Sequence, residues 1–291
     1  MSASAALERY DRASAKVSRL VLREYSTSFG LASALLAREM RPHIANIYGL
    51  VRVADEIVDG PAHAAGLDVA ARGEVLDRLE DELRSARAVG YSANPVVHSF
   101  VATARRFGIG EDLTAAFFAS MRADLTTVTY TQEMFDAYVY GSAEVVGLMC
   151  LEVFLGDDEV SPARRARLEH GARRLGAAFQ KVNFLRDLAE DHDELGRTYF
   201  PGTSDGVLGD ERKGEITTSI RRDLDVARES LPDLPSGARP AVIAALRLFA
   251  ELNRRIERVP ASVVARRRVR VPAAVKACIV AGAVRTGRRS V

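Results

Sequence analysis

Apolar residues recur at helical spacing along almost the whole chain. They repeat every three to four positions, and no stretch shows the strict apolar–polar alternation of a half-buried strand. The pattern predicts helices over residues 5–24, 31–41, 47–59, 68–89, 94–107, 111–125 and 131–154. A further helix should begin at Ser161-Pro162, a favoured N-cap followed by proline, and extend past Asp191. Because no linker divides the chain, we predict a single all-α domain spanning residues 1–291.

Two segments depart from the amphipathic norm. Residues 131–154 are apolar nearly all round, which predicts a helix buried at the centre of the bundle. Residues 194–214 contain four glycines besides the closing Gly214, and a proline, and form the one long irregular stretch. Long loops in compact domains tend to be functional or disordered, so this stretch is a candidate lid.

Composition and charge narrow the classes of protein. Hydrophobic residues make up 47% and charged residues 27%, as in a soluble globular protein. A formal charge of +2 gives no reason to expect nucleic-acid binding. Cys150 and Cys278 show no metal-binding spacing, the N-terminus lacks the apolar run of a signal peptide, and no uninterrupted apolar run reaches membrane-spanning length. We therefore expect either a cytoplasmic protein or one that contacts a membrane from the cytosolic side without crossing it.

The helix expected over residues 47–59 carries a polar stripe. Its members are Tyr48, Arg52, Asp55 and Asp59, at offsets of 4, 7 and 11. At helical spacing they fall within about 60° of one another. Two carboxylates one turn apart repel by about 0.2–0.5 kcal/mol, so the stripe predicts a cation beside it. A single such pair is more often solvated surface, and the interpretation depends on a second stripe.

A second stripe occurs on the helix expected after Ser161. Gln180, Asn183, Asp187 and Asp191 recur at offsets of 3, 7 and 11. If the two stripes face each other, they form a carboxylate-lined cavity with apolar walls. Mg²⁺ suits such a cavity, because it takes a few carboxylates together with substrate phosphate oxygens. Zinc fits poorly, since the five histidines are scattered and no His-Glu-x-x-His motif occurs.

Several motifs together resemble the squalene/phytoene synthase family, the head-to-head prenyl diphosphate synthases. The resemblance covers roughly residues 25–257. Its motifs are Tyr25-Ser-Thr-Ser-Phe29, Asp55-Glu-Ile-Val-Asp59, Tyr138 to Met149, and Asn183 to Asp191 followed by Gly196 to Pro201. The resemblance implies an isoprenoid-synthase helical bundle with a central cavity. It also implies magnesium, with Mn²⁺ as a substitute, on Asp55, Asp59, Asn183, Asp187 and Asp191.

The chemistry implied by the family joins two identical allylic diphosphates. One substrate loses diphosphate to give an allylic cation, which the double bond of the second attacks. The resulting cyclopropylcarbinyl diphosphate ionises in turn and rearranges to a linear product. The catalytic residues implied are Asp55, Asp59, Asp187, Asp191, Arg52 and Tyr48. The substrate-binding residues implied are Ser28, Phe29, Tyr138, Gln180, Asn183, Arg186, Arg197 and Tyr199.

Arginine suits diphosphate because its guanidinium can bind phosphate through two parallel hydrogen bonds. Aromatic rings can shelter a carbocation without supplying a nucleophile. For Phe29 and Tyr138, ordinary core packing is an equally good interpretation.

The product expected is phytoene, made from two geranylgeranyl diphosphates in carotenoid biosynthesis without a nicotinamide cofactor. Tyr138-Val-Tyr-Gly-Ser-Ala143 is closest to bacterial phytoene synthases, and no C-terminal membrane anchor is expected. The alternative is a squalene, presqualene diphosphate or dehydrosqualene synthase that uses farnesyl diphosphate. A non-catalytic scaffold on the same fold is the remote alternative. The sequence defines no oligomeric state.

Two departures from the family pattern and a basic C-terminus complete the picture. Glu144 stands where a glycine is expected, so it either lines and shortens the cavity or faces outward. Phe249 stands where many members have tyrosine, which would remove a hydroxyl from the cavity. Arginine clusters flank the apolar stretch 271–284 and predict either peripheral contact with anionic lipid or a final core helix with solvated arginines.

Overall fold

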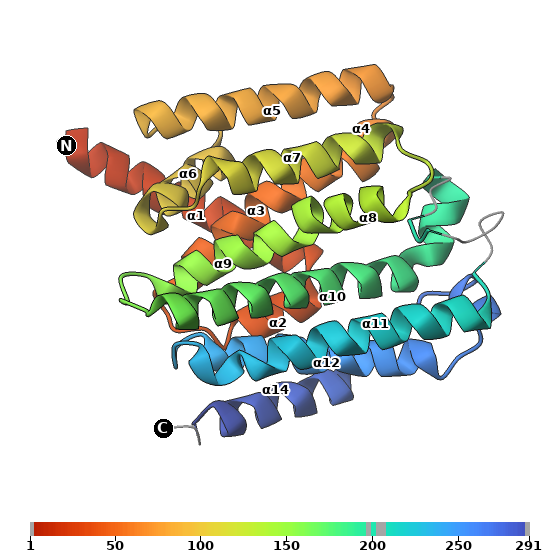
Figure 1. The fold of residues 1–291 in the computed structure, drawn as a ribbon. Helices are drawn as coiled ribbons and strands as arrows, with labels where there is room; N and C mark the ends of the chain where they lie inside the picture. Colours follow the sequence, from red (N-terminus) through yellow and green to blue (C-terminus); the bar gives the residue numbers. More distant parts are fainter. Residues whose placement is uncertain (1–2, 196–198, 202–207, 289–291) are drawn as a thin grey trace.

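The computed structural model describes residues 3–195, 199–201 and 208–288, with side chains described for residues 4–188, 199–201 and 208–286. Within these ranges every regular element is a helix, as the sequence pattern predicts (Figure 1). The α-helices are α1 (Ala3–Tyr25), α2 (Thr27–Ser33), α3 (Met40–Asp59), α4 (Pro61–Ala64), α5 (Val69–Val89), α6 (Pro95–Phe107), α7 (Glu111–Thr126), α8 (Gln132–Val139), α9 (Val145–Leu155), α10 (Pro162–Leu195), α11 (Asp210–Glu229), α12 (Arg239–Glu257), α13 (Ala261–Val264) and α14 (Ala273–Arg288). A π-helical turn, η1 (Tyr140–Glu144), joins α8 to α9, and a 3₁₀ turn, η3 (Leu231–Asp233), follows α11.

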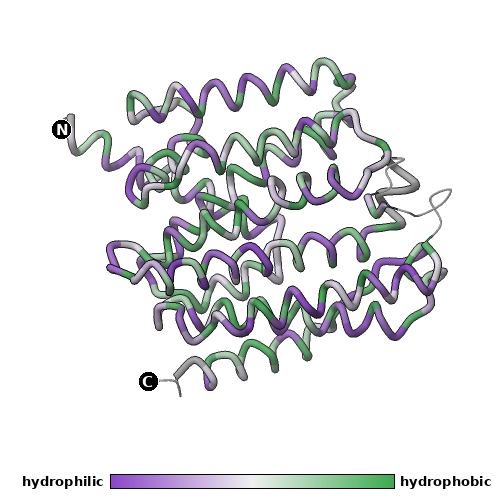
Figure 2. The backbone as a smooth tube through the Cα atoms, in the orientation of Figure 1, coloured by the Kyte–Doolittle hydropathy of each residue, from purple (hydrophilic) through white to green (hydrophobic). Residues whose placement is uncertain are grey.

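Helix α10 runs through the middle of the bundle. It packs against α11 and α12 on one side and against α9 and η1 on the other. Helices α5 and α14 lie at opposite outer faces, with α5 resting on α3, α6 and α7, and α14 on α12 (Figure 1). The hydropathy pattern follows this order, because α9 is almost uniformly apolar whereas α5 alternates polar and apolar turns (Figure 2). The central cavity lies between these layers.

Helix ends follow the local sequence, with errors in our prediction at residues 31–41 and at the irregular stretch 194–214. The ends of that stretch belong to α10 and α11, and its residues 196–198 and 202–207, with them most of the candidate lid, lie outside the described residues. Ser26 caps α2, its hydroxyl accepting a hydrogen bond from the backbone N–H of Phe29 at 3.2 Å. The expected start of α10 is confirmed, since the Ser161 hydroxyl accepts from the N–H of Arg164. The predicted helix over 31–41 is wrong: α2 ends at Ser33 and α3 already begins at Met40. Pro42 does not break α3, because proline in a first turn gives up no helical hydrogen bond.

The central helix made by α8, η1 and α9 is held unusually close to its neighbours. A side chain at Gly141 would overlap the carbonyl oxygen of Ala116 on α7. A Cβ at Gly147 would lie 2.6 Å from the carbonyl oxygen of Ala172, and one at Gly176 would lie 2.5 Å from that of Ala143. Glycine at these positions therefore lets α7 and α10 approach the backbone of the central helix.

The same helix has the length and mean hydropathy of a membrane span, although Glu144 and Glu152 interrupt its apolar run. Among the described residues, Gln132–Leu155 forms one such helix, with a mean hydropathy of 1.4 over its best window, of which 56% is buried. A buried core helix passes the same test, so this is weak evidence for a membrane segment. Its place between α7 and α10 is that of the central core helix predicted from its composition.

Replacing Gly141 by alanine should destabilise the protein by about 1–3 kcal/mol, the usual cost of overpacking a core. The added methyl group has nowhere to go except into the backbone of α7. Urea unfolding would measure the change. Gly214→Ala is the matched control, because nothing lies within 4 Å of its Cβ and alanine stabilises a helix interior by about 0.5–1 kcal/mol. Equal stability of the two variants would contradict the close packing.

Candidate active site

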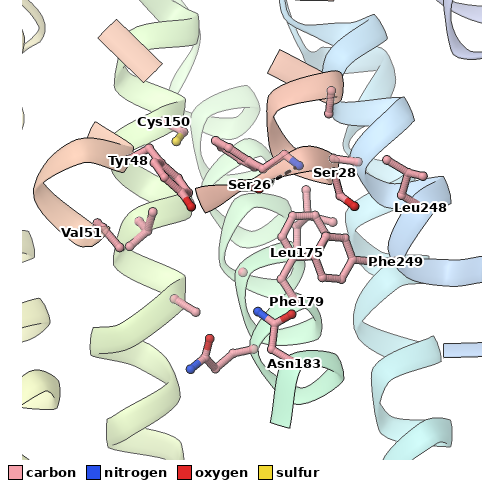
Figure 3. Close-up of a pocket in the computed structure, with 18 of the residues that line it drawn as sticks. Ser26, Ser28, Tyr48, Val51, Cys150, Leu175, Phe179, Asn183, Leu248 and Phe249 are labelled. Atoms are coloured by element: carbon pink, nitrogen blue, oxygen red, sulfur yellow. Dashed lines mark hydrogen bonds between the residues drawn. The ribbon is translucent and has the colours of Figure 1, made fainter. Parts of the chain in front are cut away.

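One cavity of about 970 Å³ occupies the centre of the bundle. Its walls come from α2, α3, the central helix, α10 and α12, together with Tyr199 and residues 268–271. Figure 3 shows Tyr48 and Cys150 on one side of this space and Phe179, Leu248 and Phe249 on the other. The volume lies at the upper end of the usual range for small-molecule sites, about 300–1,000 Å³.

The first polar stripe forms one wall of the cavity. Tyr48, Arg52, Asp55 and Asp59 all line it, as their helical spacing predicts. Arg52 Nη1 donates to Asp55 Oδ2 at 2.7 Å, and its Nη2 pairs with Glu56. The guanidinium carbon of Arg52 also lies 4.4 Å from the centre of the Tyr25 ring. Arginine thus offsets much of the repulsion between the acidic side chains of this wall.

The second stripe forms the facing wall. Gln180, Asn183, Arg186 and Asp187 of α10 line the cavity. Arg186 Nε donates to Asp187 Oδ1 at 2.9 Å. The Oδ1 atom of Asn183 is buried and has no hydrogen-bond partner among the described residues. The backbone of Asp191 lies on α10, but its side chain, like the whole of Arg197, lies outside the described residues.

The oxygen atoms of the two walls fit a magnesium ion. The unpartnered Asn183 Oδ1 stands one turn from the Asp187 carboxylate, and Asp55 lines the same space. Across the described side chains, no group of three or more His, Cys, Asp or Glu is gathered for a metal. Mg²⁺ commonly takes only one or two carboxylates and completes its octahedron with waters and substrate phosphate oxygens. The donor set therefore suits an ion that a phosphate ligand would share.

Aromatic rings continue the cavity beyond the acidic walls. Phe29 stacks on Tyr48 with ring centroids 5.6 Å apart, and Phe179 stacks on Phe249 at 3.7 Å. Burial raises the pKa of the Tyr48 phenol, so it stays protonated at neutral pH. Tyr138, Tyr199 and Ser28 also line the cavity, as predicted. The rings of Phe29 and Tyr138 are thus cavity walls as well as packing residues.

Cys150 is the one nucleophilic thiol among the cavity-lining residues that the structure describes. Burial raises the pKa of this thiol to about 12. A thiol reacts as its thiolate, so at neutral pH Cys150 is a weak nucleophile and acts as an apolar wall residue.

The two departures from the family pattern now have places. Glu144 is 5% exposed and does not line the cavity; it pairs with Arg173 Nε and Arg174 Nη2 of α10, each at 2.7 Å. It therefore neither shortens the cavity nor faces outward, but ties η1 to α10. Phe249 lines the cavity through its stacked contact with Phe179, so an aromatic face stands where a hydroxyl was expected.

Sequence reasoning missed the part played by the basic segment before α14. Arg268 and Arg270 of this segment line the cavity, as does Lys276 of α14, and Arg268 Nε lies 2.9 Å from Asp187 Oδ1. Neither of our two predictions for this segment, contact with lipid or a core helix with solvated arginines, places these side chains at the cavity. The available signal was the alternation Arg268-Val-Arg-Val271, which is typical of an extended segment with two unlike faces.

We expect Arg268→Ala to strengthen Mn²⁺ binding to the substrate-free protein about two- to fivefold. Asp187 would then lose one of two competing cations, and partly exposed ion pairs contribute about 0.2–1 kcal/mol. Electron paramagnetic resonance of free Mn²⁺ would measure the affinity. Arg267→Ala, at an exposed neighbour outside the cavity, is the control. Weaker binding in Arg268→Ala would contradict the competition.

A helical bundle around an apolar cavity, with carboxylate and arginine walls at one end, is the isoprenoid-synthase fold. Solved structures of this architecture agree. A dehydrosqualene synthase superposes with a TM-score of 0.78 at 18% identity, covering 97% of this chain and 99% of the other. Squalene synthase HpnC of Alicyclobacillus acidocaldarius gives 0.71 at 22% identity, covering 85% and 94%. At such identities the likeness shows the fold.

Sequence comparison defines the family. The family model described as Squalene/phytoene synthase matches residues 22–204, more than half of the chain. Phytoene synthase 3 (chloroplastic) of Zea mays is 34% identical over 260 residues, 81% of this chain and 58% of that protein. Phytoene synthase of Arthrospira platensis is 32% identical over 263 residues, 82% of each chain. The chain belongs to the squalene/phytoene synthase family, and it spans about three fifths of the length of three plant relatives that it matches, from Zea mays, Arabidopsis thaliana and an Oncidium hybrid.

Proposed function

We propose that the protein is a prenyltransferase that condenses two geranylgeranyl diphosphates head to head to phytoene, in carotenoid biosynthesis. The observation that carries this proposal is the pair of carboxylate and arginine walls at one end of a long apolar cavity. Such a site can bind a diphosphate at the polar end and its hydrocarbon tail along the rest. Phytoene synthases among the relatives, at 30–34% identity, support the product.

The polar end would promote loss of diphosphate. Asp55, Asp59, Asn183, Asp187 and Asp191 would hold magnesium, which when bound stabilises negative charge on the leaving diphosphate. Arg52 and Arg186 line the same space, and their guanidinium groups can donate to phosphate oxygens. Because both arginines already pair with aspartates of the site, they are held at the place where the leaving group gains charge.

The apolar walls would protect the cations. An allylic cation, and the cation formed when the cyclopropylcarbinyl diphosphate ionises, are both destroyed by water or a nucleophile. Phe29, Tyr48 and Phe179 offer ring faces, which attract a cation within about 6 Å. The protonated Cys150 thiol and the aliphatic side chains around it add no reactive group.

The length of the cavity along α10 supports a twenty-carbon substrate. The cavity-lining residues of α10 begin at Leu168, fifteen positions before Asn183, which corresponds to about 22 Å along the helix axis. An extended chain advances about 1.2 Å per bond, so a geranylgeranyl chain spans about 18 Å and a farnesyl chain about 13 Å. A farnesyl chain would therefore end near Leu175 and leave the space beside Gly171 and Ser230 empty.

The second candidate is a synthase that joins two farnesyl diphosphates to squalene, presqualene diphosphate or dehydrosqualene. The solved structures of a dehydrosqualene synthase and a squalene synthase share the fold and keep this candidate in view. We propose a cytoplasmic location and no nicotinamide requirement. Peripheral lipid contact through residues 266–291 is a further proposal, which liposome flotation with and without that segment would test.

Incubation of the protein with magnesium and each prenyl diphosphate alone, followed by identification of the hydrocarbon, tests the function. Phytoene from geranylgeranyl diphosphate, without a reductant, is the result expected. Squalene formed from farnesyl diphosphate only when reduced nicotinamide is added would refute the proposal. If neither prenyl diphosphate loses its diphosphate on incubation with the protein, the result would favour a non-catalytic scaffold.

A further inference from the structure

A buried carboxylate stands behind the aromatic wall, away from both acidic stripes. Asp124 of α7 is 3% exposed and does not line the cavity. The phenol of Tyr138 donates to its Oδ2 at 2.6 Å, and the phenol of Tyr199 donates to its Oδ1 at 3.2 Å. Both tyrosines do line the cavity. Asp124 is therefore linked to the cavity wall through these two phenols.

The two tyrosines belong to a compact set of rings. Tyr130 contacts both, with centroids 5.4 Å from Tyr138 and 5.5 Å from Tyr199. Phe184 of α10 stacks on Tyr199 at 3.9 Å. Burial, ahead of the nearby Asp124 charge, raises the pKa of the Tyr138 phenol well above its usual value, so it stays a hydrogen-bond donor. The set thus joins α7, α8, α10 and the segment 199–201 that follows the second acidic motif.

We propose that Asp124 is a positioning residue that holds the Tyr138 ring, with Tyr199 as its second hydrogen-bonded partner, at the cavity wall beside a cation. A hydrogen bond at the phenol sets how far the ring reaches into the cavity, and a ring attracts a cation only within about 6 Å of its centre. Hydrogen bonds to an ionised acceptor are about twice as strong as neutral ones, which makes a carboxylate better suited than an amide to hold two phenols. The inference rests on the proposed function, because that chemistry supplies the cation.

A positioning role for Asp124 can be distinguished by experiment from that of a buried acid that only stabilises the fold. A structural acid would affect folding and all ligands alike, whereas a positioning acid affects the cationic ligand more than a neutral one of the same shape. Asp223 provides the comparison, because it is also buried, at 7% exposed, and pairs with Lys181 Nζ at 2.8 Å and with Arg174. Neither Asp223 nor these two partners lines the cavity.

The test is binding of two probes to the whole protein by calorimetry, with magnesium and pyrophosphate present. One probe is geranylgeranyl dimethylamine, which is protonated at neutral pH, and the other is its uncharged isostere with isopropyl in place of dimethylammonium. Asp124→Asn should weaken the amine by about three- to tenfold relative to the isostere, the range of a desolvated cation–π contact. Asp223→Asn should leave the ratio of the two affinities unchanged.

A double-mutant cycle checks that Asp124 acts through the rings. In a Tyr138→Phe and Tyr199→Phe background, Asp124→Asn should change the affinity ratio less than twofold, because the coupled groups are already gone. An affinity ratio in Asp124→Asn equal to that of wild type, or a full effect in the double-phenylalanine background, overturns the proposal. If the wild-type protein binds neither probe, both this proposal and the proposed function are overturned. If the protein makes phytoene normally but Asp124→Asn leaves the ratio of the two probe affinities unchanged, only the role of Asp124 is overturned.

Discussion

Replacing Asp55 or Asp187 by asparagine is expected to lower phytoene formation about a thousandfold or more. Each substitution removes one negative charge from a wall of the site and keeps the shape of the side chain. Metal stabilisation of a leaving group contributes several kcal/mol, and each 1.4 kcal/mol is about tenfold in rate. Initial rates of diphosphate release and of hydrocarbon formation, at saturating magnesium, would measure the loss.

The fold should survive these substitutions. Asp55 pairs with Arg52 at a partly exposed position, and such pairs contribute about 0–1 kcal/mol to stability. Asp157→Asn, which breaks an exposed ion pair with Arg106 outside the cavity, is the matched control and should keep wild-type turnover. Retained turnover in a folded Asp55 or Asp187 variant would exclude the two-walled metal–diphosphate site.

Placing phenylalanine at Ala172 is expected to change the length of the product. Ala172 lines the cavity beside Gly171, at the depth reached by a geranylgeranyl chain and not by a farnesyl chain. The added ring should lower kcat/KM for geranylgeranyl diphosphate at least about tenfold, because steric rejection in a packed core costs about 1–3 kcal/mol or more. Turnover of farnesyl diphosphate should persist, giving thirty-carbon products.

Ala166→Phe is the control for Ala172→Phe, since Ala166 is exposed on the same helix outside the cavity. Ala172→Leu, a smaller change, covers the case in which the phenylalanine variant folds poorly. Equal losses with both substrates in the leucine variant would show that the space beside Gly171 does not hold the end of the chain.

Most of the fold follows from local rules that a sequence displays. The 3.6-residue period predicts the long helices, and Ser161-Pro162 marks the start of α10 because capping is decided by neighbouring residues. The junction of α2 and α3 was mispredicted because Pro42 is compatible with both a helix end and a first turn. The π-helical turn at Tyr140–Glu144 depends on contacts with α7 and α10, which no local pattern encodes.

The site residues likewise fall into those that a local sequence pattern predicts and those that only tertiary contacts place. The two stripes were predictable because polar side chains on one helix face keep their spacing in any helical fold, and all members with described side chains line one cavity. Arg268 and Asp124 were not, because each reaches the site through a contact with residues distant in sequence. Glu144 was misjudged for the same reason: its partners Arg173 and Arg174 lie a helix away. Roles set by tertiary contacts need the structure.

A competition between geranylgeranyl and farnesyl diphosphates, at equal concentration in one reaction with magnesium and no reductant, addresses head-to-head synthesis on twenty-carbon chains. The ratio of the hydrocarbons formed reports relative kcat/KM directly. The cavity depth predicts that phytoene exceeds thirty-carbon products by about tenfold or more. A preference for farnesyl diphosphate, or a hydrocarbon that forms only after reduced nicotinamide is added, would contradict it.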